Sequence, residues 1–431
     1  MKLLTFRYIW VVIFFCLAGC HKLNPGGPAA APTNVRVVSG DTIATVTWDM
    51  VPGVQYFIFW DTASGLTPDG CGSSPTCRAT IQASSPYVIT GLTDGTTYSV
   101  TINGRTQGGA GGPGSPSVSF VPGYAGINWT SGNAGINALN AITFGNIYDT
   151  SGNNLGNGYV ASGVSGALYY GIVDVNNSLN WSAITNPSPS ITYNALTNSG
   201  ATYLAVGNGG SILYSANYAE TWTPITTTTT PNNLFAISSF STFFTATGQN
   251  GTILTSDSSG TIWSPQTSGT SNNLNGITIG SVYVVVGDSG TLLTSTNAAN
   301  WTANTTVASS FSSINLKSVA YCAVTPPSGV WSGTTIYPYV AVGSGGTVLT
   351  SIDGGTTWTS QVLSNGAATL TGVTCGHQFV AVDDSGKIFT SFDGLAWTGP
   401  AQTATGALNA IAHGLYDYTA VGASGLTFHS M

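Results

Sequence analysis

The chain has 431 residues, of which 5% are charged and 42% hydrophobic, and its 8 Lys and Arg against 15 Asp and Glu give a formal net charge of −7. Long helices and coiled coils need many more charged residues, and nucleic-acid binding needs clustered Lys and Arg, so both are excluded. The 56 Gly residues, together with abundant Ser, Thr and Asn, favour an all-β protein.

Residues 1–19 have the features of a bacterial export signal. The apolar run Tyr8 to Phe15 is too short to span a bilayer and follows a positively charged start. The next residues, Leu17-Ala18-Gly19-Cys20, resemble the bacterial lipobox, which implies cleavage before Cys20 and lipidation of its thiol. His21 then implies an outer-membrane lipoprotein under the enterobacterial sorting rule, facing either the periplasm or the cell surface.

Residues 20–31 are expected to form a flexible tether, and residues 32–122 a small β-sandwich. Ala44–Trp48 alternates apolar and polar residues as half-buried strands do. Leu92 and Tyr98 have the Leu-x5-Tyr spacing of a tyrosine corner, in which the Tyr hydroxyl bonds the backbone upstream. With an early Trp and a final Ser-Pro-Ser strand, these features resemble a fibronectin type III domain.

Residues 123–431 contain an internal repeat of about 40 residues, a period typical of solenoids and propellers. Each unit opens with Leu or Tyr, and a second strand ends near Val-Gly before a turn at x-x-Gly. Seven such units alternate with seven Trp residues that are out of phase with them: Trp129, Trp181, Trp222, Trp263, Trp301, Trp358 and Trp397. A ring closed by the strand around Trp129 explains the offset and removes exposed sheet edges. We therefore predict an all-β chain, with a fibronectin type III-like sandwich followed by a seven-bladed β-propeller.

The turns before these Trp residues share a second motif. Ser351, Asp353, Gly355, Thr357 and Trp358 match the full Asp-box pattern Ser-x-Asp-x-Gly-x-Thr-Trp, and Ser391, Asp393 and Trp397 match a version one residue shorter. Asp and Ser side chains bond turn backbone, Gly accepts positive φ and Trp packs into the sheets, so these residues are interpreted as structural. The repeats resemble Asp-box (BNR-like) propellers, most closely the photosystem II assembly-factor family. That resemblance implies a surface on which other proteins dock.

Enzyme activity is not expected. Sialidases of this fold hold the substrate carboxylate with three arginines, whereas all four Arg residues of this chain, Arg7, Arg36, Arg78 and Arg105, precede the propeller. A glycoside hydrolase needs two opposed carboxylic acids, and it stays an alternative because spacing alone assigns no pair. The His and Cys residues lack metal-site spacing, so we expect neither a metal nor another cofactor.

Four cysteines of the mature chain follow Cys20 and suit an oxidising envelope. Cys71 and Cys77 are expected to close a short loop in the sandwich. Cys322 and Cys375 occupy nearly equivalent places in adjacent repeat units, where they either form a second disulfide or stay as buried thiols.

Two parts of the propeller are candidate binding surfaces. The residue after the opening Leu or Tyr of each unit should approach the axial opening, and these residues are Asn140, Asn194, Phe235, Asn275, Lys317, Thr371 and Asn409. Such a mostly amide ring either binds a sugar or a polar peptide loop, or bonds backbone inside the ring. The longest insertion, Thr325–Pro338, carries Trp331 and Tyr337, and long loops often have functional roles.

These patterns predict a monomeric, non-enzymatic cell-envelope lipoprotein that is attached to the membrane through Cys20. Its propeller would act as a protein-docking or assembly scaffold for an envelope protein or a glycan. The alternative is a surface carbohydrate-binding protein or glycoside hydrolase, which exposed aromatic residues on the ring faces would favour.

Overall fold

The computed structural model describes residues 26–174, 178–225, 230–327, 330–363, 366 and 368–430. The predicted signal peptide and Cys20 lie outside the described residues. The chain divides into two compact units, the first ending at Pro122 and the second beginning at Gly123, with the segment Gly40–Thr42 grouped with the second. Within the described ranges, no helix is long and apolar enough to cross a membrane.

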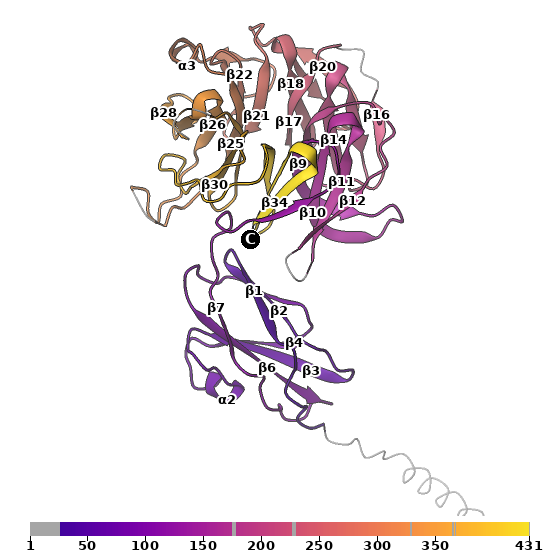
Figure 1. Ribbon diagram of the computed structural model, residues 1–431, viewed down its shortest axis with the longest axis vertical. Helices are drawn as coiled ribbons and strands as arrows, with labels where there is room; N and C mark the ends of the chain where they lie inside the picture. The colour runs from indigo at the N-terminus through magenta and orange to yellow at the C-terminus, as the bar shows by residue number, and fades with distance from the viewer. Residues whose placement is uncertain are drawn as a thin grey trace, which may run out of the picture. The chain divides into compact units, whose positions relative to one another are not determined.

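In the described part of the first unit, antiparallel strands form two sheets with the orders β1-β2-β5 and β4-β3-β6-β7 (Figure 1). The strands are β1 (Arg36–Gly40), β2 (Ile43–Thr47), β3 (Val54–Asp61), β4 (Arg78–Ala83), β5 (Tyr87–Ile89), β6 (Tyr98–Thr106) and β7 (Val118–Phe120), and the short helix α2 spans Pro68–Cys71. Inward side chains of both sheets, including Trp48 and Ile58, meet in one buried core. The Tyr98 hydroxyl accepts a hydrogen bond from the Thr93 N–H (3.2 Å), as a tyrosine corner requires.

The end of the predicted tether is bound to this unit. The N–H of Ala29 donates to the Gly104 carbonyl (3.1 Å), and the N–H of Thr106 donates to the Gly27 carbonyl (2.9 Å). Pro28 forms an antiparallel bridge with Arg105. These contacts pair backbone groups in the part of β6 that lies beyond its pairing with β7. Residues 27–29 are therefore bound to the sandwich, whereas we expected a flexible tether.

The second unit contains seven antiparallel sheets within its described residues, one for each sequence repeat, and they are numbered here as blades 1 to 7. Blades 1 to 4 consist of β9 (Leu139–Tyr148), β10 (Asn154–Gly163), β11 (Leu168–Val173) and β12 (Leu179–Ala183); β13 (Tyr193–Ser199), β14 (Thr202–Gly207), β15 (Ile212–Ser215) and β16 (Thr223–Ile225); β17 (Leu234–Phe240), β18 (Phe243–Gly248), β19 (Ile253–Ser256) and β20 (Trp263–Gln266); and β21 (Leu274–Ile279), β22 (Tyr283–Gly287), β23 (Leu292–Ser295) and β24 (Thr302–Ala303).

The short helix α3 (Thr305–Ser310) follows blade 4 in the sequence. Blades 5 to 7 consist of β25 (Leu316–Tyr321), β26 (Tyr339–Gly343), β27 (Thr347–Ser351) and β28 (Thr359–Val362); β29 (Leu370–Cys375), β30 (Phe379–Asp383) and β31 (Ile388–Ser391); and β32 (Leu408–His413), β33 (Tyr418–Gly422), β34 (Leu426–Ser430) and β8 (Thr130–Asn133). The central residues of the second strands, such as Leu204–Val206 in β14, have no exposed surface because neighbouring blades cover both of their faces.

The blades close into a ring. The first strand of each blade contacts the first strand of the next, and β32 of blade 7 contacts β9 of blade 1 (Figure 1). The early strand β8 pairs with β34, so that Ser131 lies opposite Phe428. Trp129 stacks on the Phe428 ring, with 5.7 Å between the ring centroids. The predicted architecture, a sandwich followed by a seven-bladed propeller closed by a strand near Trp129, is confirmed.

Candidate functional site

A β-bulge marks the start of the first strand in all seven described blades. In blade 2, Tyr193 pairs with Gly207 and Ala195 with Val206, which leaves Asn194 without a cross-strand partner. The same shift skips the second residue of the first strand in the other six blades. A bulge re-aims the side chain of the extra residue. The skipped residues are the seven that the sequence placed near the axis.

Glycine at the end of the second strand makes room for this bulge. In blade 3, Gly248 pairs with Leu234, and a Cβ on Gly248 would collide with the backbone oxygen of Asn233. Five further blades have the same close approach, at Gly163, Gly207, Gly287, Gly343 and Gly422. In blade 6, Asp383 takes this place opposite Leu370. In the other six blades, the Val-Gly motif of the repeat reflects backbone contact rather than turn formation.

All seven bulge residues line one axial cavity of about 550 Å³, and each is half-buried. They form one layer of the cavity, called here the polar layer because six of its seven residues are polar: Asn140, Asn194, Phe235, Asn275, Lys317, Thr371 and Asn409. The next residue of each strand is small, from Ala141 in blade 1 to Ala410 in blade 7, and the one after it is a branched aliphatic residue such as Ile142. The cavity thus has a polar layer, a small-residue layer and an aliphatic layer.

Most of the polar layer is bonded to the neighbouring blade, which was one of the two interpretations left open by the sequence. Each of five side chains donates to the carbonyl of the opening residue of the next blade, an interaction called here the inter-blade clasp. The clasps are Asn140 Nδ2 to Tyr193 (3.3 Å), Asn194 Nδ2 to Leu234 (2.9 Å), Asn275 Nδ2 to Leu316 (2.9 Å), Thr371 Oγ1 to Leu408 (2.7 Å) and Asn409 Nδ2 to Leu139 (2.8 Å). The last one joins blade 7 to blade 1.

Phe235 and Lys317 depart from this pattern. The carbonyl of Leu274, which a residue at position 235 would clasp, accepts instead from the Thr247 hydroxyl of blade 3 (3.3 Å). Thr247 is fully buried, so its hydroxyl supplies the Leu274 carbonyl with a hydrogen bond inside the protein. Phe235 is thereby released from the clasp and lines the cavity as an aromatic ring.

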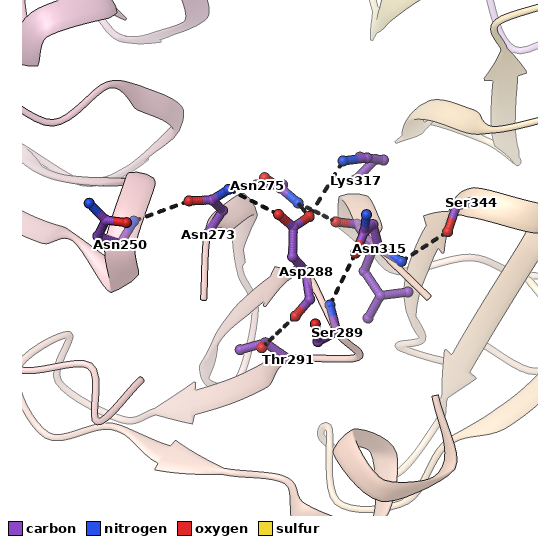
Figure 2. Close-up of polar contacts among 10 residues, drawn as sticks. Asn250, Asn273, Asn275, Asp288, Ser289, Thr291, Asn315, Lys317 and Ser344 are labelled. Atoms are coloured by element: carbon purple, nitrogen blue, oxygen red, sulfur yellow. Dashed lines mark hydrogen bonds and ion pairs between the residues drawn. The ribbon is translucent and has the colours of Figure 1, made fainter. Parts of the chain in front are cut away.

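Lys317 turns toward Asp288, which lies in the hairpin between β22 and β23 (Figure 2). Its Nζ is 3.5 Å from Asp288 Oδ1, and the two side chains keep 35% and 25% of their surface exposed. Asn275 Nδ2 donates to Asp288 Oδ1 (2.7 Å) and Asn273 Nδ2 to Asp288 Oδ2 (3.0 Å). Among the described residues that line the cavity, Asp288 and Lys317 are the charged ones.

The sequence analysis did not identify Asp288 as a residue of the axial site. The available signal was its alignment with Asn208 of blade 2, which occupies the same place in the x-x-Gly turn. Asn208 Oδ1 accepts from Asn194 Nδ2 (3.0 Å), as Asp288 Oδ1 accepts from Asn275. The contact recurs in two blades, but Asp288 adds a charge to it.

The insertion in blade 5 lies apart from the residues of the axial cavity. Trp331 is half-buried and packs against the hydrophobic core of blades 5 and 6, whereas Tyr337 is 55% exposed. The structure therefore brings the ring residues together but does not bring Trp331 or Tyr337 to them.

Two disulfides are present in the described chain. Cys71 and Cys77 are bonded in the first unit, with 5.3 Å between their Cα atoms. Cys322 and Cys375 are bonded between blades 5 and 6, and their Cα atoms are 6.1 Å apart, within the usual span of a disulfide. The second bond covalently joins two neighbouring blades.

The Asp residues of the Trp turns bond their own backbone. Asp353 accepts from the Thr357 N–H (2.9 Å) and hydroxyl (2.6 Å), while Ser351 Oγ accepts from the Gly355 N–H (2.9 Å). The Thr357 hydrogen bonds hold the pKa of Asp353 at about 2. Trp358 Nε1 donates to the Gly355 carbonyl (3.0 Å). In the shorter turn, Ser391 Oγ accepts from the Gly394 N–H (2.8 Å), and Asp393 Oδ1 accepts from the Ala396 N–H (2.8 Å).

The seventh Trp turn is assembled from both ends of the propeller. Ser430 Oγ accepts from the Gly126 N–H (2.8 Å), and Trp129 Nε1 donates to the Gly126 carbonyl (2.9 Å). These bonds correspond to those of Ser351, Gly355 and Trp358, although Ser430 and Gly126 are 304 residues apart. The last turn therefore helps to close the ring.

One buried polar cluster lies between blades 7 and 1. Tyr159 OH donates to Asp417 Oδ1 (2.8 Å), and His429 Nε2 is 3.7 Å from Asp417 Oδ2. Burial raises the pKa of Asp417 to about 6 and lowers the pKa of His429 to about 4. Asp417 is 7% exposed and is not among the residues that line the axial cavity.

Comparison with known proteins supports both units of the fold. Residues 30–121 match the family model of the Fibronectin type III domain, so that prediction is confirmed. No curated protein matches the chain.

Among solved structures, YCF48 bound to D1 peptide is similar with a TM-score of 0.52 and 14% identity, covering 70% of this chain and 94% of that chain. The WD40 β-propeller domain of Doa1 is similar with a TM-score of 0.51 and 8% identity, covering 72% of this chain and 97% of that chain. YCF48 from Cyanidioschyzon merolae has a TM-score of 0.49 and 13% identity, covering 70% and 98%. At these identities the first two likenesses show the β-propeller fold alone.

Proposed function

We propose that this protein is a non-enzymatic, lipid-anchored outer-membrane protein whose Asp-box propeller serves as a protein-docking scaffold. The observation that carries this proposal is the axial cavity, whose polar side chains mostly clasp one blade to the next. Of the described residues that line it, Asp288 is the one carboxylic acid, whereas glycoside hydrolysis requires two opposed carboxylic groups. These two features support a rigid scaffold as the role of the propeller ring.

The fold comparison supports protein docking on the outer loops of this scaffold. One similar propeller, YCF48, is known bound to a D1 peptide, and another is the WD40 domain of Doa1. By this analogy, a partner protein would contact the exposed loops of the propeller, and Tyr337 of the insertion is an exposed aromatic residue of the kind that anchors protein interfaces.

The lipid anchor rests on the lipobox at Leu17-Ala18-Gly19-Cys20. Cys20→Ala should move the protein from the membrane fraction to the soluble fraction, because one thiol carries the attachment. Cys16→Ala is the matched control, since it removes a thiol from the same export signal outside the lipobox position. Equal membrane retention of the two variants would contradict the anchor.

The docking role is tested by gentle solubilisation and purification through a C-terminal tag. We expect one envelope protein at near one-to-one stoichiometry, and we expect Tyr337→Ser to release it. Phe243→Ser is the control, because Phe243 is 51% exposed on a hairpin of a different blade. Purification without a stoichiometric partner would count against a stable assembly role.

A further inference from the structure

The amide oxygens of the polar layer are available to a ligand. A backbone carbonyl can only accept a hydrogen bond, so each clasp fixes the NH₂ group of its Asn toward the next blade. The Oδ1 atom of the same amide is then not the group that makes the clasp. Among the described contacts, Asn140, Asn194 and Asn409 use Nδ2 in the clasp and leave Oδ1 as an acceptor at the cavity.

Lys317 and Asp288 give the cavity a hydrogen-bond donor without a net charge. An ammonium group has three N–H donors, and Asp288 engages Lys317 only at 3.5 Å, which leaves donors for a ligand. The Asp288 carboxylate is balanced by Lys317 and held by two amides. A ligand with a net charge would leave that charge unbalanced in a half-buried site, so the chemistry favours a neutral one.

Phe235 supplies an apolar plane in the same cavity, within an otherwise amide-rich layer. The aliphatic layer, including Ile237, adds apolar surface to the same cavity. A cavity of about 550 Å³ has the size of a small-molecule site rather than of a flat protein interface.

From this combination we infer that the axial cavity binds the terminal one or two sugar units of a neutral glycan. Each sugar hydroxyl both donates and accepts, so it can satisfy an Asn Oδ1 and Lys317 Nζ. The C–H face of a pyranose ring packs on the Phe235 ring. This binding goes beyond the docking role and depends neither on the lipid anchor nor on a protein partner.

The test measures binding of chitotriose, cellotriose and maltotriose to the purified full chain in mild detergent, by calorimetry or ligand-observed NMR. We expect at least one of these neutral sugars to bind with a Kd below about 1 mM. Phe235→Leu keeps the apolar volume but removes the aromatic plane, and should weaken binding about fivefold. Lys317→Met together with Asp288→Asn keeps the site neutral but removes its ammonium donors, and should weaken binding about tenfold.

Two control variants separate binding from folding. Phe240→Leu changes an exposed aromatic residue at the other end of β17, and Lys387→Met removes a lysine from blade 6; both should leave affinity unchanged. Unchanged melting temperatures establish that each variant is folded.

Three results would overturn the inference: no binding of any of the three sugars, equal affinity of cavity and control variants, or binding of the neutral peptide acetyl-Ala-Ala-Ala-amide in place of the sugars. The C-terminal tag experiment is independent of all three, so failure of sugar binding and failure of protein docking can be told apart.

Discussion

The Trp turns and the axial ring repeat with the same period but use their polar side chains differently. In the Trp turns other than the closing one at Ser430 and Gly126, Ser, Asp or Asn bond backbone within about five residues, as Asp353 does with Thr357. In the axial ring, the bond crosses to the next blade, as between Asn194 and Leu234, 40 residues apart. The first set stabilises single turns, whereas the second stabilises the ring as a whole.

This difference indicates which positions of the repeat can vary and which variations point to a ligand site. A turn that is bonded only within itself can vary without affecting the neighbouring blades. In blade 2, Asn217 replaces the Asp, and its Oδ1 accepts the same hydrogen bond from the Thr221 N–H (3.1 Å). At one axial position a change is compensated, because the Thr247 hydroxyl takes over the clasp where Phe235 stands. Compensated departures from the repeat, such as Phe235, are therefore the better guide to a ligand site.

The largest expected effect concerns the bulge that both the clasp and the cavity require. Gly248→Ala should lower the free energy of unfolding by about 3 kcal/mol, because the new Cβ would collide with the Asn233 carbonyl oxygen. Gly209→Ala is the control, since it has open space around its Cβ and meets only the cost of a left-handed backbone (φ 65°), about 1 kcal/mol. Equal losses in denaturant unfolding would show that the close approach does not matter.

A second prediction concerns Asp417, the aspartate that is buried between blades 7 and 1. Asp417 has a pKa of about 6, above the ordinary 3.8, so the folded protein binds this proton more tightly and stability falls as pH rises from 3.8 to 6. Asp417→Asn keeps an acceptor for Tyr159 and should raise the free energy of unfolding at pH 7.5 by about 2 kcal/mol.

The gain from Asp417→Asn should disappear near pH 4, where the wild-type carboxyl is protonated. The neighbouring His429 has a pKa of about 4, below the ordinary 6.5, so its contribution is lost as pH falls from 6.5 to 4 in both proteins and cancels in the difference. Denaturant unfolding of the two proteins at both pH values measures this. A variant less stable than wild type at pH 7.5 would mean that Asp417 and His429 form a stabilising ion pair.

A third prediction tests the compensation at Phe235. Thr247→Val removes the buried donor to the Leu274 carbonyl and should cost about 1.5 kcal/mol. Phe235→Asn should restore a clasp to that carbonyl, so the double variant should recover about 1 kcal/mol of the loss. A double-mutant cycle from denaturant unfolding gives the coupling energy. Strict additivity would show that the two positions do not share the clasp.

The sequence was sufficient for features set by local spacing. The opening Leu or Tyr and the Trp of each unit predicted the seven blades, the closing strand and the seven residues around the axis. Backbone bonding inside the ring was one interpretation of the sequence, but the partner of each clasp could not be predicted, because it is a carbonyl in the next blade and depends on a bulge that appears only when two strands are paired. Ser430 was missed for a similar reason, since its turn partner Gly126 lies at the other end of the propeller.

The smallest expected effect belongs to the Trp turn with the full motif. Asp353→Asn should lower the free energy of unfolding at pH 7 by no more than about 0.5 kcal/mol, because the exposed turn screens the charge and Oδ1 still accepts from Thr357. The chain already uses this replacement at Asn217 and Asn297.

The low pKa of Asp353 means that its charge stabilises the fold above pH 3.8 and that this contribution is lost as pH falls through 2. Urea unfolding at pH 7 and pH 2.5 should show the difference between the two proteins shrinking, whereas Asp353→Ala, which also removes the acceptor, should cost about 1 kcal/mol at pH 7. A loss of several kcal/mol for Asp353→Asn would make the turn, and not the axial clasps, the main stabilising element of the repeat.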